Sequence, residues 1–187
     1  MRKLIAQEFV TLDNFAAGLH DELDFMPQTT PGDWTDSVEQ NQWDFVQTID
    51  TMILGRNTYQ MFADYWPCAT ERMAPVINAL NKFVCSRTLR DAPWGDSGSV
   101  SIIHNDIPKQ IEELKKQPGK DIVIWGSIAL VQSLCETQLV DEYQFIISPV
   151  ILGAGKKLFP ERQLDLEFGD AKVLEGGYLL LKYGPAT

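Results

Sequence analysis

Residues 121–136, DIVIWGSIALVQSLCE, join an apolar segment, a small-residue turn and a helical pattern with no linker between them. The segment Ile122–Ile124 predicts a short buried strand, and Leu130 and Leu134 recur at helical spacing. Gly126 allows a sharp turn and the close approach of a ligand. The helix that follows offers free N–H groups and a positive dipole end, which together can bind a phosphate. The same pattern also fits an ordinary strand-to-helix junction, and this stretch alone leaves both interpretations open.

Apolar strand patterns and helical patterns alternate along the rest of the chain. Strands are expected at 3–10, 51–54, 83–85, 100–103 and 142–150, and helices at 36–47, 56–65, 73–80 and 107–116. This alternation predicts a mainly parallel sheet covered by helices on both faces. No helical pattern follows Asp141, so the last strands, within 174–183, are expected to form an antiparallel hairpin around Gly176-Gly177. A length of 187 residues suits one domain spanning 1–187.

Charge and cysteine content limit the classes of partner and location. A formal net charge of −10 argues against nucleic acid or an anionic membrane surface, so the expected partner is a small-molecule substrate. No apolar run approaches the roughly 20 residues that span a bilayer, and Glu8 interrupts the first apolar segment too early for a signal peptide. Three widely spaced cysteines predict a reducing, cytoplasmic location. The two histidines have no ligand-like spacing, so no metal site is expected.

Three of the predicted strands end in similar polar turns. Residues 54–59 read LGRNTY, residues 85–88 read CSRT, and residues 124–127 read IWGS. Ligands of open α/β sheets bind beyond the carboxyl ends of the strands, and Arg suits bidentate contacts with phosphate. Taken singly, each turn is better explained by a solvated helix start or a cap. Three such turns at one edge favour a ligand with separated phosphates, such as a dinucleotide with an additional 2′-phosphate.

Taken in order, the motifs resemble those of the dihydrofolate-reductase-like superfamily. The motifs are TLDN (11–14), LGRNTY (54–59), VCSRT (84–88), VIWGS (123–127), LVDE (139–142) and SPVILGAG (148–155). The chain is most similar to the reductase domain at the C-terminal end of the bifunctional riboflavin-biosynthesis deaminase–reductase, and to its stand-alone bacterial relatives. The resemblance covers nearly the whole chain. It implies an α/β fold with a twisted, mainly parallel sheet of about eight strands and flanking helices, NADPH as the cofactor, and a homodimer.

The resemblance implies a cofactor site built from four short segments. The segment after the second predicted strand meets the phosphates of the cofactor, and the next one meets the 2′-phosphate side of its adenosine. The third segment lies under the pyrophosphate and the nicotinamide, and the fourth lies near the nicotinamide end. Their residues are Gly55, Arg56 and Thr58; Ser86, Arg87 and Thr88; Trp125, Gly126 and Ser127; and Gly153 and Gly155.

The chain departs from the family pattern at positions that bear on the substrate. Asn14 stands where the family often has Gly, and Asn tolerates the unusual backbone angles that this turn needs. Riboflavin-pathway reductases carry a Lys where this chain has Gln7, and an Asp-Asp-Pro pattern that is missing after Tyr59. No acidic residue clearly takes the place of the substrate-binding carboxylate of dihydrofolate reductases. These departures weaken the case for the riboflavin-pathway substrate.

Hydride transfer from a nicotinamide to a C=N or C=O bond also requires a proton donor. Asp13 and Asp33, beside the first strand, are the candidates, whereas Asp36 is better explained as a helix cap. Asn14 and Trp34 are expected to line the substrate pocket, where Trp34 can stack on a planar heterocycle.

The predicted function is therefore an NADPH-dependent reductase of a small heterocyclic substrate, resembling 5-amino-6-(5-phosphoribosylamino)uracil reductase. Two alternatives stay open, namely an NADP(H)-binding module without turnover and a dihydrofolate-reductase-like activity.

Overall fold

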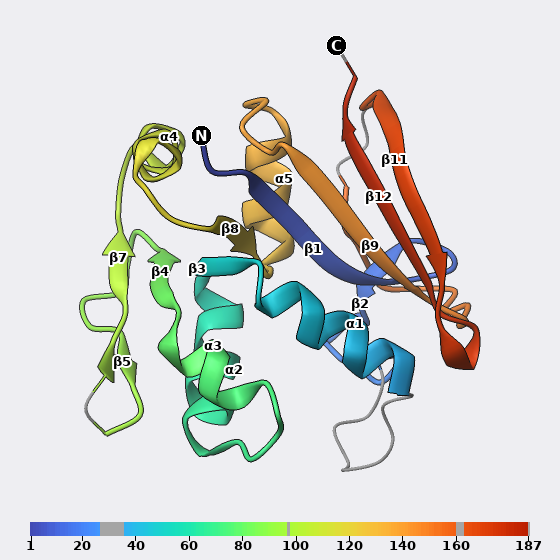
Figure 1. Cartoon of the computed structure of the whole chain (residues 1–187), viewed down its shortest axis with the longest axis horizontal. Helices are drawn as coiled ribbons and strands as arrows, with labels where there is room; N and C mark the ends of the chain where they lie inside the picture. The colour runs from blue at the N-terminus through green and yellow to red at the C-terminus, as the bar shows by residue number, and fades with distance from the viewer. Residues whose placement is uncertain (27–35, 97, 160–162, 187) are drawn as a thin grey trace.

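Alternating strands and helices build one large twisted sheet in the computed structural model, which describes residues 1–26, 36–96, 98–159 and 163–186 (Figure 1). The strands are β1 (Leu4–Thr11), β2 (Phe15–Ala17), β3 (Ile49–Gly55), β4 (Asn81–Cys85), β5 (Pro93–Trp94), β6 (Gly98–Ser99), β7 (Ser101–Ile103), β8 (Asp121–Ile124), β9 (Glu142–Ser148), β10 (Lys156–Lys157), β11 (Leu166–Val173) and β12 (Leu179–Pro185). The helices are α1 (Asp36–Val46), α2 (Arg56–Tyr65), α3 (Ala74–Ala79), α4 (Ile107–Lys116) and α5 (Ile128–Cys135), with 3-10 turns η1 (Trp66–Cys68) and η2 (Glu175–Gly177).

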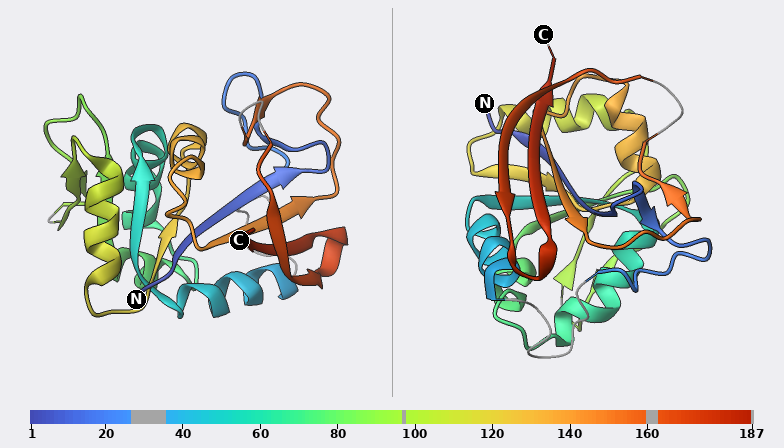
Figure 2. Two further views of the ribbon diagram at one scale, coloured as in Figure 1. Left: turned by 90° about the horizontal axis from the view of Figure 1, so that it is seen from above. Right: turned by 90° about the vertical axis from the view of Figure 1, so that its right-hand side faces the viewer.

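The large sheet has eight strands in the order β11-β12-β9-β1-β8-β3-β4-β7. All neighbours from β9 to β7 are parallel, whereas β12 pairs antiparallel with β9 and with β11. The resulting hairpin extends the twisted sheet beyond β9 (Figure 2). The predicted α/β class, with a mainly parallel sheet and antiparallel C-terminal strands, is confirmed.

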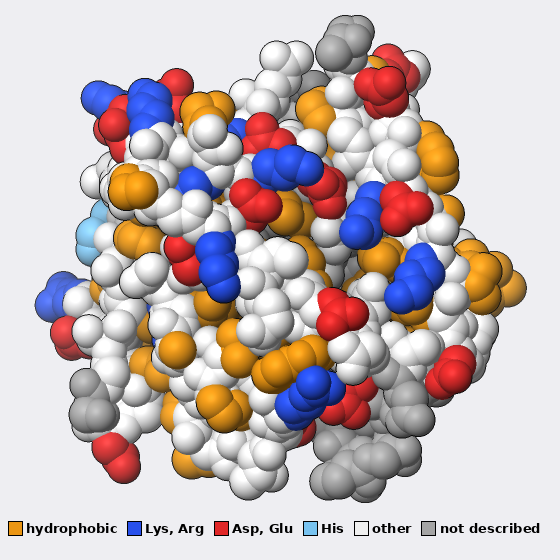
Figure 3. Space-filling view, in the orientation of Figure 1, with side chains coloured by type: hydrophobic (Ala, Val, Ile, Leu, Met, Phe, Trp, Pro, Cys, Tyr) orange, Lys and Arg blue, Asp and Glu red, His pale blue; other side chains and the backbone are white. Residues whose placement is uncertain are grey.

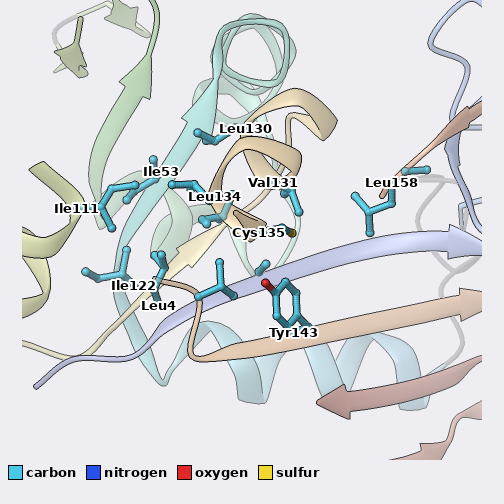
Figure 4. Packing of buried hydrophobic residues seen from close by; sticks show 14 of the residues in the cluster. Leu4, Ile53, Ile111, Ile122, Leu130, Val131, Leu134, Cys135, Tyr143 and Leu158 are labelled. Carbon is cyan, nitrogen blue, oxygen red and sulfur yellow. The ribbon is translucent and has the colours of Figure 1, made fainter. Parts of the chain in front are cut away.

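Two apolar layers hold the helices on opposite faces of the sheet. Alternation along β8 sends Ile122 and Ile124 into one layer, with α4 and α5, and Val123 into the other, with α1, α2 and α3. Leu130 and Leu134 of α5 pack against the first of these layers (Figure 4). Each such fully buried aliphatic side chain contributes about 1.5–3 kcal/mol relative to an exposed one.

The C-terminal hairpin begins earlier than the sequence pattern indicates. Its turn does contain Gly176 and Gly177, both with positive φ, but β11 starts at Leu166 rather than after 173. Apolar residues alternate at Leu166 and Phe168 and again at Ala171 and Val173, but the bulge between Phe168 and Asp170 breaks the period. All of the strand apart from Leu166 is exposed. The short pairs β2–β10 and β5–β6 were also missed, because two or three residues are too few to form a periodic pattern.

The connections that leave β3 and β8 run in opposite directions along the sheet. The chain leaves β8 through α5 and reaches β9, beyond β1, whereas it leaves β3 through α2 and reaches β4 on the other side. Ligands of open α/β sheets bind where neighbouring strands diverge in this way. Pairing between β1 and β8 ends at Ala6 and Ile124, while β1 continues beside β9 as far as Thr11. β8 ends at Ile124, and β1 runs on away from it beside β9 (Figure 2).

Candidate active site

Two glycine turns meet at the carboxyl ends of β3 and β8. The N–H of Gly55 donates to the carbonyl of Gly126 at 3.2 Å. A Cβ on Gly55 would overlap the side chain of Ser127, and a Cβ on Gly126 would lie 2.5 Å from Thr58 Oγ1. Gly126 also has φ +56°, a conformation that favours glycine, and its peptide bond to Ser127 is cis. The two turns thus pack so closely that neither has room for a larger residue.

Two helices begin at these turns, from opposite faces of the sheet. Gly55 is the N-cap of α2 and Ser127 is the N-cap of α5, and neither cap makes a side-chain hydrogen bond to its helix. The first N–H groups of both helices therefore lack a capping side chain. Because both helix dipoles direct their positive ends to one place, an anion is favoured there.

A third turn follows β4 and contacts the first. Ser86 is buried, and its Oγ accepts from the N–H groups of Thr88 at 3.3 Å and Leu89 at 3.1 Å. Arg56 Nη1 donates to Thr88 Oγ1 at 3.2 Å, which joins the turns after β3 and β4. Arg56 and Arg87 are both exposed, so their guanidinium groups can reach a ligand. The structure brings these two arginine-bearing turns together as the strand-end pattern predicts.

His104 lies at the same edge, immediately after β7. Its Nδ1 is 3.0 Å from the carbonyl of Ser86. Since a carbonyl only accepts, Nδ1 carries the proton, and Nε2 is left as the second ring nitrogen. Sequence reasoning considered His104 only as a metal ligand, although it follows a predicted strand as the other site residues do.

Glu8 on β1 is the functional candidate that sequence reasoning missed. Its Oε1 accepts the N–H of Gly126 at 2.7 Å, so the side chain reaches from β1 to the turn after β8. Burial raises the pKa of Glu8 from 4.5 to about 8, and the Gly126 hydrogen bond offsets only part of that rise. The carboxyl is therefore mostly protonated at neutral pH. A charged residue interrupting an apolar strand was the available sequence signal.

A buried polar chain runs on the other face of β1. Trp125 Nε1 donates to Gln7 Oε1 at 2.9 Å, and Gln7 Nε2 donates to Gln144 Oε1 at 3.0 Å. Gln144 in turn donates to Glu142 at 2.7 Å. Gln7 stands at the position where riboflavin-pathway reductases carry Lys. Its side-chain amide accepts from Trp125 and donates to Gln144, both within the protein. The Trp125 ring, half-buried, packs beside Phe45.

Asp13 ties the end of β1 to the loop after β9. Its carboxylate accepts from Thr11 Oγ1 at 2.6 Å and from the N–H groups of Leu152 at 3.1 Å and Gly153 at 2.8 Å. The Thr11 hydroxyl, followed by these backbone donors, lowers the pKa of Asp13 to about 2. An ionised carboxylate has no proton to deliver at neutral pH. The arrangement is that of a loop tether and gives no support to Asp13 as a catalytic acid.

The glycines of the loop after β9 lie with this tether. Gly153 has φ +76° and donates to Asp13, while a Cβ on Gly155 would overlap the carbonyl of Ala17 in β2. The structure therefore places Gly155 against β2 and Gly153 beside Asp13, and no hydrogen bond among the described residues joins either glycine to the Gly126 turn. Asn14, in the same turn as Asp13, is exposed and has φ +68°, the conformation expected of it.

Two of the predicted site residues, Asp33 and Trp34, lie outside the described residues, as does the side chain of Asp36. Within the described ranges, no cluster of three His, Cys, Asp or Glu side chains could hold a metal ion. None of the helices described is long and apolar enough to cross a membrane. The three cysteines, all among the described residues, form no disulfide.

Comparisons with known proteins agree with this geometry. A family model described as the RibD C-terminal domain matches residues 2–180. Among curated proteins of Bacillus subtilis (strain 168), the uncharacterized protein YyaP is 29% identical over 189 residues, covering 97% of this chain and 94% of YyaP. The uncharacterized protein YwjB is 31% identical over 133 residues, covering 69% of this chain and 71% of YwjB.

Solved structures share the fold over nearly the whole chain. A Shewanella sp. PV-4 protein ascribed to riboflavin biosynthesis aligns with TM-score 0.77 and 20% identity, covering 99% of both chains. The Thermotoga maritima diaminohydroxyphosphoribosylaminopyrimidine deaminase/5-amino-6-(5-phosphoribosylamino)uracil reductase aligns with TM-score 0.72 and 11% identity, covering 99% of this chain and 57% of that one. Enterococcus faecalis dihydrofolate reductase, complexed with NADP(H), aligns with TM-score 0.63 and 15% identity, covering 99% of this chain and 97% of that one.

Proposed function

The chain belongs to the RibD C-terminal domain family, and from this premise we propose that it is an NADPH-dependent reductase of a small heterocyclic substrate. The observation that carries the proposal is the meeting of two uncapped helix starts over the paired turns of Gly55 and Gly126. The N–H groups there suit a pyrophosphate, because they combine hydrogen-bond donors with the positive ends of two helix dipoles. NADPH, when bound, would supply the hydride, and this chain would bind and orient it.

The arginine-bearing turns support NADPH over NADH. Arg56 and Arg87 are exposed beside Thr88, at one side of the paired glycine turns, and would hold the 2′-phosphate. Charge-assisted hydrogen bonds are worth about 1.5–3 kcal/mol, or roughly 10–100-fold in affinity. Arg87→Ala is therefore expected to weaken NADPH binding by about that factor and to leave NADH binding unchanged. Arg90→Ala, which removes an exposed arginine three residues further on, is the control.

The reductase proposal is tested with cofactor and substrate panels. Thermal shift with NADPH and with NADH measures cofactor binding, and loss of the nicotinamide absorbance band with pterin and pyrimidine substrates measures turnover. Stabilisation by NADPH together with oxidation by one substrate class supports a reductase and identifies its substrate. Stabilisation without oxidation by any substrate favours an NADP(H)-binding module instead. No stabilisation by either cofactor contradicts both.

We also propose a cytoplasmic homodimer. Phe168 and Val173 of β11 are exposed, and Phe168 continues an aromatic row through Tyr183 to Phe145. Apolar side chains are visible along the edge of the molecule where β11 lies (Figure 3). An exposed apolar strand at a sheet edge is a typical place for association with a second copy. Phe168→Glu is expected to convert a dimer to a monomer in light scattering, and a wild-type monomer would contradict the proposal.

A further inference from the structure

Glu8 stands where β1 and β8 part, next to the turn to which we assign the dinucleotide. The last paired residues of these strands are Ala6 and Ile124, and Glu8 lies two residues beyond that pair on β1. Its carboxyl closes the separation by accepting the Gly126 N–H at 2.7 Å. This N–H immediately precedes the Ser127 cap of α5, so the position of Glu8 and the position of the turn depend on each other.

The second carboxyl oxygen of Glu8 has no hydrogen-bond partner among the described residues, and the side chain is partly exposed. An acid fixed through one oxygen and accessible through the other can offer an O–H to a ligand when it is protonated. In water a glutamate side chain is ionised at neutral pH, so the protonation state of Glu8 depends on how far the protein shields its carboxyl from solvent. Burial raises the pKa of Glu8 to about 8.

No charged partner compensates Glu8 from the elements around it. The ionisable residues of β8, β9, α5 and β10, all described, are Asp121, Glu142, Tyr143, Cys135, Lys156 and Lys157. The helix α2, whose Thr58 lies against Gly126, begins with Arg56, which donates to Thr88. No ion pair or hydrogen bond joins any of them to Glu8, and Lys156 pairs instead with Asp21. An ionised Glu8 would therefore place a negative charge that no ion pair neutralises against the turn to which we assign the phosphate.

We propose that Glu8 is a positioning residue of the dinucleotide site, whose neutral carboxyl holds the Gly126 amide and whose ionisation opposes phosphate binding at the same turn. The inference rests on the proposed function. Its consequence is a thermodynamic linkage, because a dinucleotide that binds the neutral form keeps one proton on Glu8. Binding at alkaline pH must then take up a proton from solution.

Titration calorimetry with NADPH tests this linkage on the unmodified protein. Measured in buffers of different ionisation enthalpy, proton uptake is expected to rise from near zero at about pH 7 towards one per NADPH at about pH 9. The affinity is expected to fall by up to about tenfold per pH unit above the Glu8 ionisation. The 2′-phosphate of NADPH contributes little, because phosphate monoesters lose their second proton near pH 6.

The variant Glu8→Gln is the isosteric mimic of the neutral acid, since its amide oxygen can still accept from Gly126. It is expected to lose the alkaline fall in affinity, because an amide does not ionise. Glu167→Gln, the same substitution on exposed β11, is the control and should keep that fall. All titratable groups other than Glu8 and Glu167 are the same in the three proteins, so a pH dependence that only Glu8→Gln loses is due to Glu8.

The outcomes separate this inference from the proposed function. Equal pH dependence in the unmodified protein and Glu8→Gln, or no proton uptake by the unmodified protein, overturns the role of Glu8 and leaves the reductase proposal standing. Failure of the unmodified protein to bind NADPH at either pH overturns the proposed function, and this inference with it. If Glu8→Gln does not fold, proton uptake by the unmodified protein decides alone.

Discussion

Replacing Gly55 by alanine is expected to destabilise the protein by about 1–2 kcal/mol, because the added methyl group would clash with the side chain of Ser127. Gly55 has φ −76° and ψ 163°, which alanine adopts without strain. The added methyl group, however, would overlap Ser127 Oγ and lie 2.8 Å from Ser127 Cβ. The cost therefore arises between the turns after β3 and β8, rather than in the backbone of position 55.

The magnitude follows from two opposing effects. Overpacking a close contact costs about 1–3 kcal/mol, while a Gly→Ala change at permissive angles returns about 0.4–1 kcal/mol by restricting the unfolded chain. Ser127→Gly removes both of the side-chain atoms that the methyl group meets, and leaves Ser127 N at 3.0 Å as the nearest atom. In the Ser127→Gly background, Gly55→Ala should therefore cost little. The coupling energy between the two changes is expected to be about 1–2 kcal/mol in the stabilising direction.

Urea unfolding of the four proteins of this double-mutant cycle measures the coupling, provided that the m-values agree. Ser127→Gly alone is a mild change, because Ser127 makes no capping hydrogen bond and Gly is an acceptable N-cap residue. Additivity within about 0.3–0.5 kcal/mol would refute the reasoning, since it would mean that the Ser127 side chain does not fill the space beside Gly55.

Three further predictions concern the polar groups around the site. Trp125→Phe removes the donor to buried Gln7 Oε1 and should lower the free energy of unfolding by about 1–3 kcal/mol in urea titrations; no loss would mean that water replaces the indole. The raised pKa of Glu8, about 8 against 4.5, means that between these pH values the unfolded chain releases a proton that the folded protein keeps. Stability should therefore fall as pH rises through this window, by at most about 1.4 kcal/mol per pH unit, and Glu8→Gln should lack that component of the slope. Asp13→Asn should speed amide hydrogen exchange at Gly153 and leave that of α5 unchanged, and unchanged exchange at Gly153 would contradict the tether.

The sequence pattern predicts well those parts of the fold that have a long apolar period. Helices α2 and α4 have the expected bounds, and the strand–turn–helix of β8 and α5 is confirmed. In β11 the apolar alternation is short and is broken by the bulge between Phe168 and Asp170, so the pattern did not indicate that the strand starts at Leu166.

The part of the candidate site that could be predicted from the sequence is the part that follows from one rule, namely that parallel strands end at the same edge of a sheet. The turns after β3, β4 and β8 meet because parallel strands end at one edge, which sequence order alone indicates. That they bind a cofactor stays a prediction. The proximity of Glu8 to Gly126 follows from where β1 and β8 stop pairing, and no local pattern encodes that point. The assignment of Asp13 failed to find support for the same reason, since its partners Leu152 and Gly153 are distant in sequence.

The central place of β1 in the sheet has a consequence for the order in which the chain folds. Its partners on either side come from the second half of the sequence, as the separations of 118 residues from Gln7 to Trp125 and 137 residues from Gln7 to Gln144 show. During synthesis, β1 emerges before both of its neighbours, β8 and β9. Such distant pairings slow folding, because a long loop must close before any contact rewards it. β1 therefore becomes fully paired only after β8 and β9 have been synthesised, and its apolar residues need protection until then.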